Sequence, residues 1–172
     1  KPAIRAWRDG RVVYDGGVFR MLYRTYPEIL EETTPRLKRP GFYFENQISY
    51  IGYAESKDGV YFERREDSFI TPDADFDRYG CEDPRVTKLG STYYIFYTAL
   101  STYPFGPEGI KIGVALSKDL KRITAKHPVT PFNSKAMALF PEKIEGKFAA
   151  VLTVDTDRPP ATIGIALFEN EA

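Results

Sequence analysis

Two neighbouring carboxylates and an arginine stand together in Glu82-Asp83-Pro84-Arg85, which we call the acid motif. Because a proline disfavours right-handed helical geometry in the residue before it, we expect Asp83 in an extended or turn conformation at the end of a loop. Neighbouring side chains on an extended segment point opposite ways, so one carboxylate can face a cleft while the other binds structure. Glycoside cleavage needs a carboxyl group held in such a place. The alternative is a surface turn in which Asp and Arg simply pair.

The acid motif stands just ahead of an aromatic strand that belongs to a repeated pattern. Each copy of the pattern joins a glycine turn to a strand rich in aromatic and β-branched residues. The copies cover residues 14–24, 88–98 and, in a shorter version, 145–153. Each copy predicts a β-hairpin.

A second segment follows each predicted hairpin, and in it small Gly and Ala alternate with larger residues. Its three copies cover residues 51–58, 112–119 and 163–170. This alternation is typical of strands that pack tightly on a neighbouring sheet. The first two copies end in Ser-Lys-Asp, which predicts a turn into an outer strand such as residues 61–65.

Two interleaved elements that recur three times, about 50 to 60 residues apart, indicate a β-propeller. We therefore predict an all-β chain of four-stranded antiparallel sheets, divided into blade-like units at about residues 1–75, 76–133 and 134–172. The polar segment 27–41 and the segment 99–109 are predicted to be loops, of the kind that builds a substrate cleft on one face. Three blades do not close a ring and leave sheet faces uncovered. Either the chain is part of a longer protein or copies associate as a homo-oligomer over the open edges.

Composition narrows the class of protein. Acidic and basic residues balance at 24 each, so no overall field favours nucleic acid or an anionic membrane. The sequence has no apolar run of membrane-spanning length and no signal-peptide pattern, so we expect a cytoplasmic protein. With one histidine, His127, and one cysteine, Cys81, we expect no metal site and no cofactor. Cys81 is expected to be a small buried packing residue and His127 to lie inert on an outer turn.

The acid motif, together with the strand at residues 93–98, resembles glycoside hydrolase family 130. Similar segments are Met21-Leu22-Tyr23-Arg24, the segment 51–59 and Leu139-Phe140-Pro141-Glu142-Lys143. The similarity spans nearly the whole chain and follows the family's order of motifs. Members of that family are five-bladed β-propellers that cleave β-mannosides with inversion, as phosphorylases or hydrolases. The resemblance therefore implies the first three of five blades, a β-mannoside oligosaccharide as substrate and inorganic phosphate as a possible co-substrate.

The resemblance also implies roles for single residues. It makes Asp83 the general acid, which in the phosphorylases gives its proton to the glycosidic oxygen by way of a mannose hydroxyl. Lys135 matches a position where the family often places a polar ligand. Glu82 is a candidate substrate contact, and it is also a like-charged neighbour of the acid unless Arg85 neutralises it.

Three further side chains are candidate substrate contacts. Arg24 could clamp sugar hydroxyls or an anion, or it could form a salt bridge. Tyr97 and Tyr103 are candidates for stacking on a sugar ring.

Departures from the family pattern leave phosphorolysis and hydrolysis both open. The third hairpin strand runs on through residues 152–157 before reaching Arg158. If this insertion is looped out, Arg158 is a candidate phosphate ligand, because guanidinium pairs well with phosphate. If it is not, Asp155 or Asp157 is a candidate base for water. Two other readings are another five-bladed glycosidase and a sugar-binding or scaffolding propeller segment without activity.

Overall fold

The computed structural model describes residues 8–26 and 48–169, and in this part of the chain the strands form three antiparallel sheets. The first sheet contains β1 (Arg8–Asp15), β2 (Val18–Thr25), β3 (Tyr50–Ser56) and β4 (Glu63–Arg64). The second contains β5 (Gly80–Leu89), β6 (Thr92–Leu100), β7 (Ile110–Ser117) and β8 (Ala125–Pro128). The third contains β9 (Met137–Leu139), β10 (Phe148–Val154) and β11 (Thr162–Phe168).

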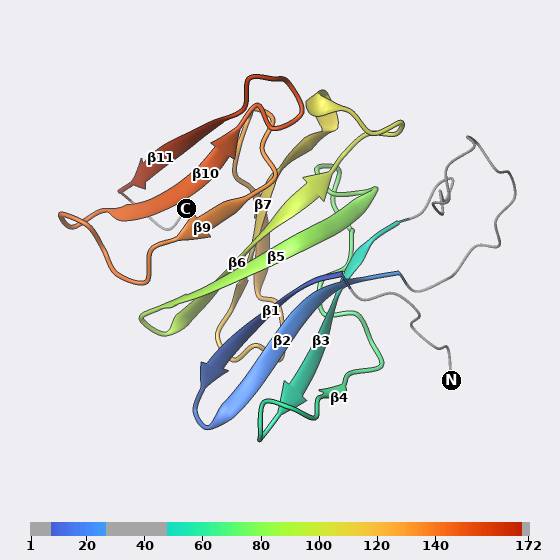
Figure 1. Cartoon of the computed structure of the whole chain (residues 1–172), viewed down its shortest axis with the longest axis vertical. Coiled ribbons are helices and arrows are strands. Elements are labelled where there is room, and N and C mark those ends of the chain that lie inside the picture. The colour runs from blue at the N-terminus through green and yellow to red at the C-terminus, as the bar shows by residue number, and fades with distance from the viewer. Residues whose placement is uncertain (1–7, 27–47, 170–172) are drawn as a thin grey trace, which may run out of the picture.

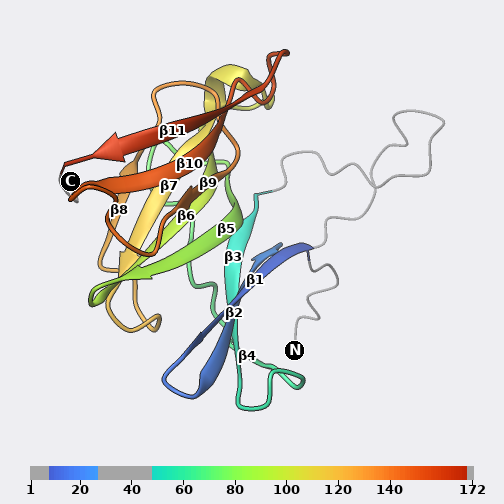
Figure 2. The same ribbon diagram turned by 60° about the vertical axis from the view of Figure 1, so that its left-hand side comes forward.

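The three sheets follow one another in chain order, and the second lies between the other two (Figure 1; Figure 2). Strands adjacent in sequence are adjacent in each sheet, with orders β1-β2-β3-β4, β5-β6-β7-β8 and β11-β10-β9. This arrangement confirms the predicted all-β architecture of antiparallel, four-stranded sheets. The third sheet has three strands among the described residues. The predicted loop at residues 27–41 falls outside them.

The predicted hairpins form at the glycine turns. β1 and β2 are joined by Gly16 and Gly17, whose φ angles are 60° and 78°, and β5 and β6 meet at Gly90, whose φ is 60°. Glycine reaches positive φ without steric cost, which tight hairpin turns require. Apart from the short 3₁₀ turn η1 (Pro107–Gly109), the described residues contain no helix, and so none long and apolar enough to cross a membrane.

The core lies on both faces of β6, which is buried along its whole length. Tyr93, Ile95 and Tyr97 pack toward the first sheet. Tyr94 and Phe96 pack toward the third. A strand covered on both faces shows no alternation of polar and apolar residues, which explains the continuous aromatic run in this part of the sequence.

The small residues of the repeated second segment serve a purpose different from the predicted one. Gly52 pairs with Tyr23 on the adjacent strand, and Gly113 pairs with Tyr97 in the same way. A Cβ at Gly52 would lie 2.6 Å from the Tyr23 ring, and one at Gly113 would lie 2.8 Å from the Tyr97 ring. The glycines therefore accommodate a tyrosine ring from the paired strand of their own sheet, and at Gly113 the ring of Phe76, 3.0 Å from the Cβ position, occupies the same space.

This pairing predicts the effect of alanine at equivalent positions of the repeat. Gly113→Ala should lower the free energy of unfolding by roughly 1–3 kcal/mol, because the Tyr97 ring must shift inside the core. Gly164→Ala is the matched control, since its Cβ would meet Val154 at 3.4 Å, an ordinary contact. Urea unfolding of both variants measures the difference, and equal losses would contradict the role given to Gly113.

The Ser-Lys-Asp turns also form as predicted. The Ser56 hydroxyl accepts a hydrogen bond of 2.9 Å from the Gly59 amide, and the Ser117 hydroxyl accepts one of 2.9 Å from the Leu120 amide. Each turn leads into an outer strand, β4 or β8. His127 lies within strand β8 rather than on a turn, with its side chain exposed.

Candidate functional site

The acid motif lies inside β5, at a β-bulge. Glu82 is opposite Thr98 and Arg85 is opposite Phe96, so two residues of β5 face the single Tyr97 of β6. The extra residue places Asp83 at φ 51°, in the left-handed region. Asp83 thus avoids right-handed helical geometry, as expected, but it lies within a strand and not at the end of a loop.

A positive φ at a residue other than glycine is uncommon, and aspartate is among the residue types that tolerate it best. Such conformations cost about 1–3 kcal/mol and concentrate at functional sites, as bulges also do, where they re-aim a side chain. This conformation at Asp83 makes the acid motif the first candidate for a functional site.

Arg24, at the end of β2, connects the first sheet to this bulge. Its Nη1 atom lies 2.8 Å from Glu82 Oε2 and 3.9 Å from Asp83 Oδ1. The side chains of Arg24, Glu82 and Asp83 are 16%, 20% and 30% exposed, so the group is shielded but can still be reached by solvent.

Two expectations for these residues are corrected by this contact. The two carboxylates do not point to opposite faces, because the extra residue of the bulge interrupts the alternation and both approach Arg24. The cation that neutralises Glu82 is Arg24 from the neighbouring sheet, and not Arg85 of the same motif.

Lys135 precedes β9 at the end of the sheets where the acid motif lies. The Thr98 hydroxyl, opposite Glu82, donates a hydrogen bond of 2.6 Å to the Lys135 carbonyl. The Lys135 ammonium forms an ion pair with Asp157. We call this end of the sheets, marked by Arg24, Glu82, Asp83 and Lys135, the acid rim.

Asp157 is fixed by contacts with both Lys135 and Asn133. Besides the Lys135 ion pair, Asn133 Nδ2 donates to its carboxylate at 3.0 Å, and the Asp157 amide donates to Asn133 Oδ1 at 2.8 Å. Burial raises the pKa of Asp157, but the hydrogen bonds from Lys135 and Asn133 outweigh it and leave the pKa lowered. Asp157 is therefore a charged partner of Lys135 at neutral pH.

The two remaining predicted contacts lie on loops that follow β6 and β10. Tyr103 is exposed in the loop after β6. Arg158 is exposed after β10 and forms an ion pair with Glu108, so that it ties the two loops together.

Tyr97 does not lie where a sugar could stack on it. Its side chain is 1% exposed and its hydroxyl donates to Asp77 Oδ2 at 2.8 Å. Burial raises the pKa of Tyr97, and the neighbouring Cys81 and Asp77 raise it further. Tyr97 is a core residue, and we leave it out of the site.

Asp77 is a buried carboxylate that sequence reasoning missed. It is 0% exposed, and its Oδ2 atom lies 2.6 Å from Lys126 Nζ and 3.5 Å from Cys81 Sγ. The amides of Asp73 and Ala74 donate to its Oδ1 atom at 3.3 and 3.0 Å. Asp77 thus fixes the chain just before the acid motif, although the alternating aspartates at 73, 75 and 77 give no sign of which one is buried.

Cys81 lies in the core, as expected of a small packing residue. Burial raises the pKa of its thiol, and the adjacent Asp77 carboxylate raises it further. Because the thiolate is the reactive form, we expect Cys81 to resist alkylation by iodoacetamide in the native protein and to react fully in urea. Mass spectrometry measures both, and rapid native labelling would contradict the burial of Cys81.

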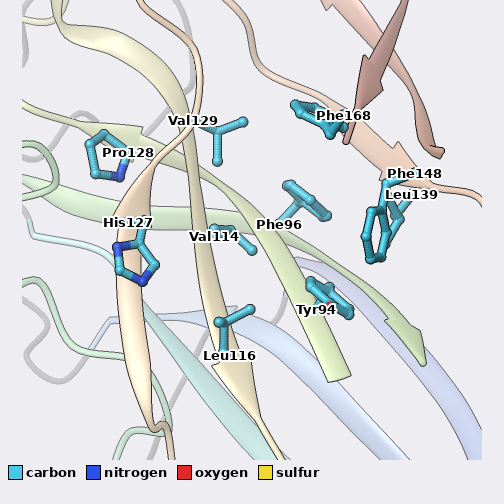
Figure 3. Close-up of a pocket in the computed structure, with 10 residues that line it drawn as sticks. All are labelled: Tyr94, Phe96, Val114, Leu116, His127, Pro128, Val129, Leu139, Phe148 and Phe168. Atoms are coloured by element: carbon cyan, nitrogen blue, oxygen red, sulfur yellow. The ribbon is translucent and has the colours of Figure 1, made fainter. Parts of the chain in front are cut away.

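A separate cavity of about 490 Å³ lies between the second and third sheets (Figure 3). Its walls are mostly apolar and include Phe96 and Val114 on one side and Phe148 and Phe168 on the other. Among the described residues, no carboxylate lines this cavity, so we do not place the glycoside chemistry there. In residues 8–26 and 48–169, no group of three or more His, Cys, Asp and Glu side chains could hold a metal ion.

A family model described as beta-1,4-mannooligosaccharide phosphorylase matches residues 40–160, which include the acid motif. The chain belongs to glycoside hydrolase family 130. It is 34% identical over 139 residues to a 1,2-beta-oligomannan phosphorylase of Thermoanaerobacter sp. strain X514, covering 79% of this chain and 42% of that protein. It is 33% identical over 116 residues to a beta-1,2-mannobiose phosphorylase of Listeria innocua, covering 67% of this chain and 31% of that protein.

A solved beta-1,2-mannobiose phosphorylase from Listeria innocua, in complex with beta-1,2-mannobiose, superimposes on the family 130 chain with a TM-score of 0.74. The match covers 97% of this chain and 56% of that structure at 24% identity, and it supports the same fold. The chain spans between 31% and 44% of the length of the curated relatives it matches.

Proposed function

We propose that the full-length protein cleaves β-mannosides with inversion, by phosphorolysis or hydrolysis, with Asp83 as the general acid. The observation that carries the proposal is the strained position of Asp83 in a shielded bulge beside Glu82 and Arg24. Family 130 membership and the mannoside names of the relatives supply the substrate class.

In the proposed step, the proton of the Asp83 carboxyl group passes to the glycosidic oxygen, directly or through a hydroxyl of the bound mannose. The bond between this oxygen and the anomeric carbon breaks, and its electron pair leaves with the departing sugar. An oxygen of phosphate or water forms the new bond from the opposite face, which inverts the configuration. The attacking group loses its proton to solvent or to a base.

The other residues of the acid rim support this step in the proposal. Glu82 accepts the closer contact from Arg24, which holds the guanidinium beside Asp83, where the proposal places the sugar. Lys135, oriented by Asp157, is the proposed polar ligand on the side of the third sheet.

We infer that phosphorolysis is the first candidate reaction, because the named relatives are phosphorylases. Arg158 is the proposed phosphate ligand on this chain, and it would have to exchange its contact with Glu108 for the anion. Hydrolysis is the second candidate, since one structure of similar fold comes from work on family 130 glycoside hydrolases that target β-1,2-mannosidic linkages.

The assay that separates these possibilities incubates the full-length protein with β-1,2- and β-1,4-mannobiose, with and without inorganic phosphate. Mannose 1-phosphate formed only with phosphate supports the phosphorylase, and free mannose formed with water alone supports the hydrolase. Binding of mannobiose without either product would contradict catalysis and support a sugar-binding segment instead.

A further inference from the structure

Three aromatic rings gather beside the acid rim without entering the core. The ring centroids of Tyr79 and Tyr103 lie 6.3 Å apart at an interplanar angle of 35°, and those of Tyr103 and Phe105 lie 5.4 Å apart at 87°. Tyr103 is 41% exposed and Phe105 47%. Tyr79 is half-buried. Most aromatic side chains on the strands are buried, so two exposed rings on a loop, in contact with a third, call for an explanation.

The position of these rings relative to Asp83 follows from the strand. Tyr79 precedes β5, and its amide donates to the Leu100 carbonyl at the end of β6 with a length of 2.8 Å. Three residues lie between Tyr79 and Asp83, so their Cα atoms are at most roughly 13 Å apart even in a fully extended chain. The rings therefore lie at the same end of the second sheet as Asp83, within reach of an oligosaccharide bound there.

The loop that carries Tyr103 and Phe105 is closed firmly at its base. The Ser101 amide donates to the Gly109 carbonyl at 2.8 Å, and the Gly109 amide donates to the Gly106 carbonyl at 3.0 Å. A Cβ at Gly109 would lie 2.0 Å from the Thr102 hydroxyl oxygen, so the two ends of the loop are in close contact. A loop fixed in this way loses little conformational entropy when a ligand binds to it.

The chemistry of the rings favours a sugar. Tyr103 and Phe105 meet edge to face, so their ring planes point in different directions, and the two tyrosines add hydroxyl groups next to the apolar faces. Arg78 lies with its guanidinium 5.7 Å from the Tyr79 ring centroid, and Glu108 lies in the same loop. A pyranose has the matching features, namely an apolar C–H face and a rim of hydroxyl groups.

We propose that Tyr79, Tyr103 and Phe105 form a distal sugar platform that binds a mannosyl unit of a longer β-mannoside, beyond the sugars at the cleaved bond. This proposal rests on the proposed function for its substrate class. It gives the full-length protein a preference for oligosaccharides over the disaccharide.

The test measures the affinity of the full-length protein for β-mannobiose and for a β-mannohexaose by isothermal titration calorimetry, alongside KM for both. Tyr103→Ala should weaken hexaose binding roughly three- to tenfold, the effect of losing one stacked ring, and leave mannobiose binding within twofold. Tyr103→Phe, which keeps the ring, should retain hexaose affinity. Tyr61→Ala is the matched control, because Tyr61 is 81% exposed beyond the far end of β3.

The outcomes distinguish failure of the distal sugar platform from failure of the proposed activity. Equal hexaose affinities in Tyr103→Ala and the unsubstituted protein overturn the platform, and so does an absence of hexaose binding. A protein that turns over neither sugar but binds the hexaose through Tyr103 retains the platform, while the proposed activity fails. Equal weakening of both sugars by Tyr103→Ala also overturns it, because the ring would then act at the cleaved bond or on the fold.

Discussion

Asp83→Asn is expected to lower kcat of the full-length protein on β-mannooligosaccharides at least roughly a hundredfold, because the amide cannot supply the proton to the leaving oxygen. The substitution preserves the size of the side chain, and asparagine tolerates the positive φ of the bulge as well as aspartate does. Steady-state kinetics measures the loss, and circular dichroism checks that the fold is retained.

A substrate with a better leaving group distinguishes loss of an acid from general damage. The cleavage of 4-nitrophenyl β-mannoside needs little protonation, so the same variant should lose far less activity on it. Asp75→Asn is the matched control, since Asp75 is an exposed carboxylate in the preceding loop and should retain full activity. An Asp83→Asn protein with unchanged kcat on mannooligosaccharides would remove the acid assignment.

Asp77→Asn is expected to lower the free energy of unfolding by roughly 2–3 kcal/mol, because it removes the buried one of the two carboxylates that pair with the Lys126 ammonium and leaves only the more exposed Asp73. Lys126→Met should lower the free energy of unfolding by a similar amount, because it leaves the buried Asp77 carboxylate without its cation. Chemical denaturation of the chain measures both losses. Asp75→Asn again serves as control, with an expected change within about 0.5 kcal/mol.

The combination of the two substitutions at this pair tests the coupling directly. If Asp77 and Lys126 stabilise the fold through each other, the double variant should lose clearly less than the sum of the single variants. Additive losses would mean that the ion pair is not the reason for the burial of Asp77, and that its hydrogen bonds from Tyr97 and the loop amides are sufficient.

The architecture could be predicted from the sequence because its signals are local and repeated. A glycine at positive φ specifies each hairpin turn, as at Gly90, and the serine of each Ser-Lys-Asp segment caps a turn through its own neighbours. Because each of these weak signals recurs at the same position of the repeat, together they predict the fold. The repeat also places Gly52 and Gly113 at equivalent positions. It does not show that each glycine lies against a tyrosine ring of the paired strand.

The site was harder to predict from the sequence, because it depends on contacts between distant segments. The pairing of Arg24 with Glu82 joins two sheets, and no spacing in the sequence reports it. The bulge at Asp83 depends on the register between β5 and β6. Tyr97 was misplaced for a related reason: β6 is buried on both faces by side chains from distant segments, which the sequence of the strand itself does not name.

The most direct test of the account is a crystal structure of the full-length protein with β-mannobiose bound. We expect the sugar to lie at the acid rim, with the Asp83 carboxyl group within hydrogen-bond distance of the glycosidic oxygen or of a neighbouring hydroxyl group. A disaccharide bound elsewhere, beyond hydrogen-bond distance of the Asp83 carboxyl group, would contradict the account.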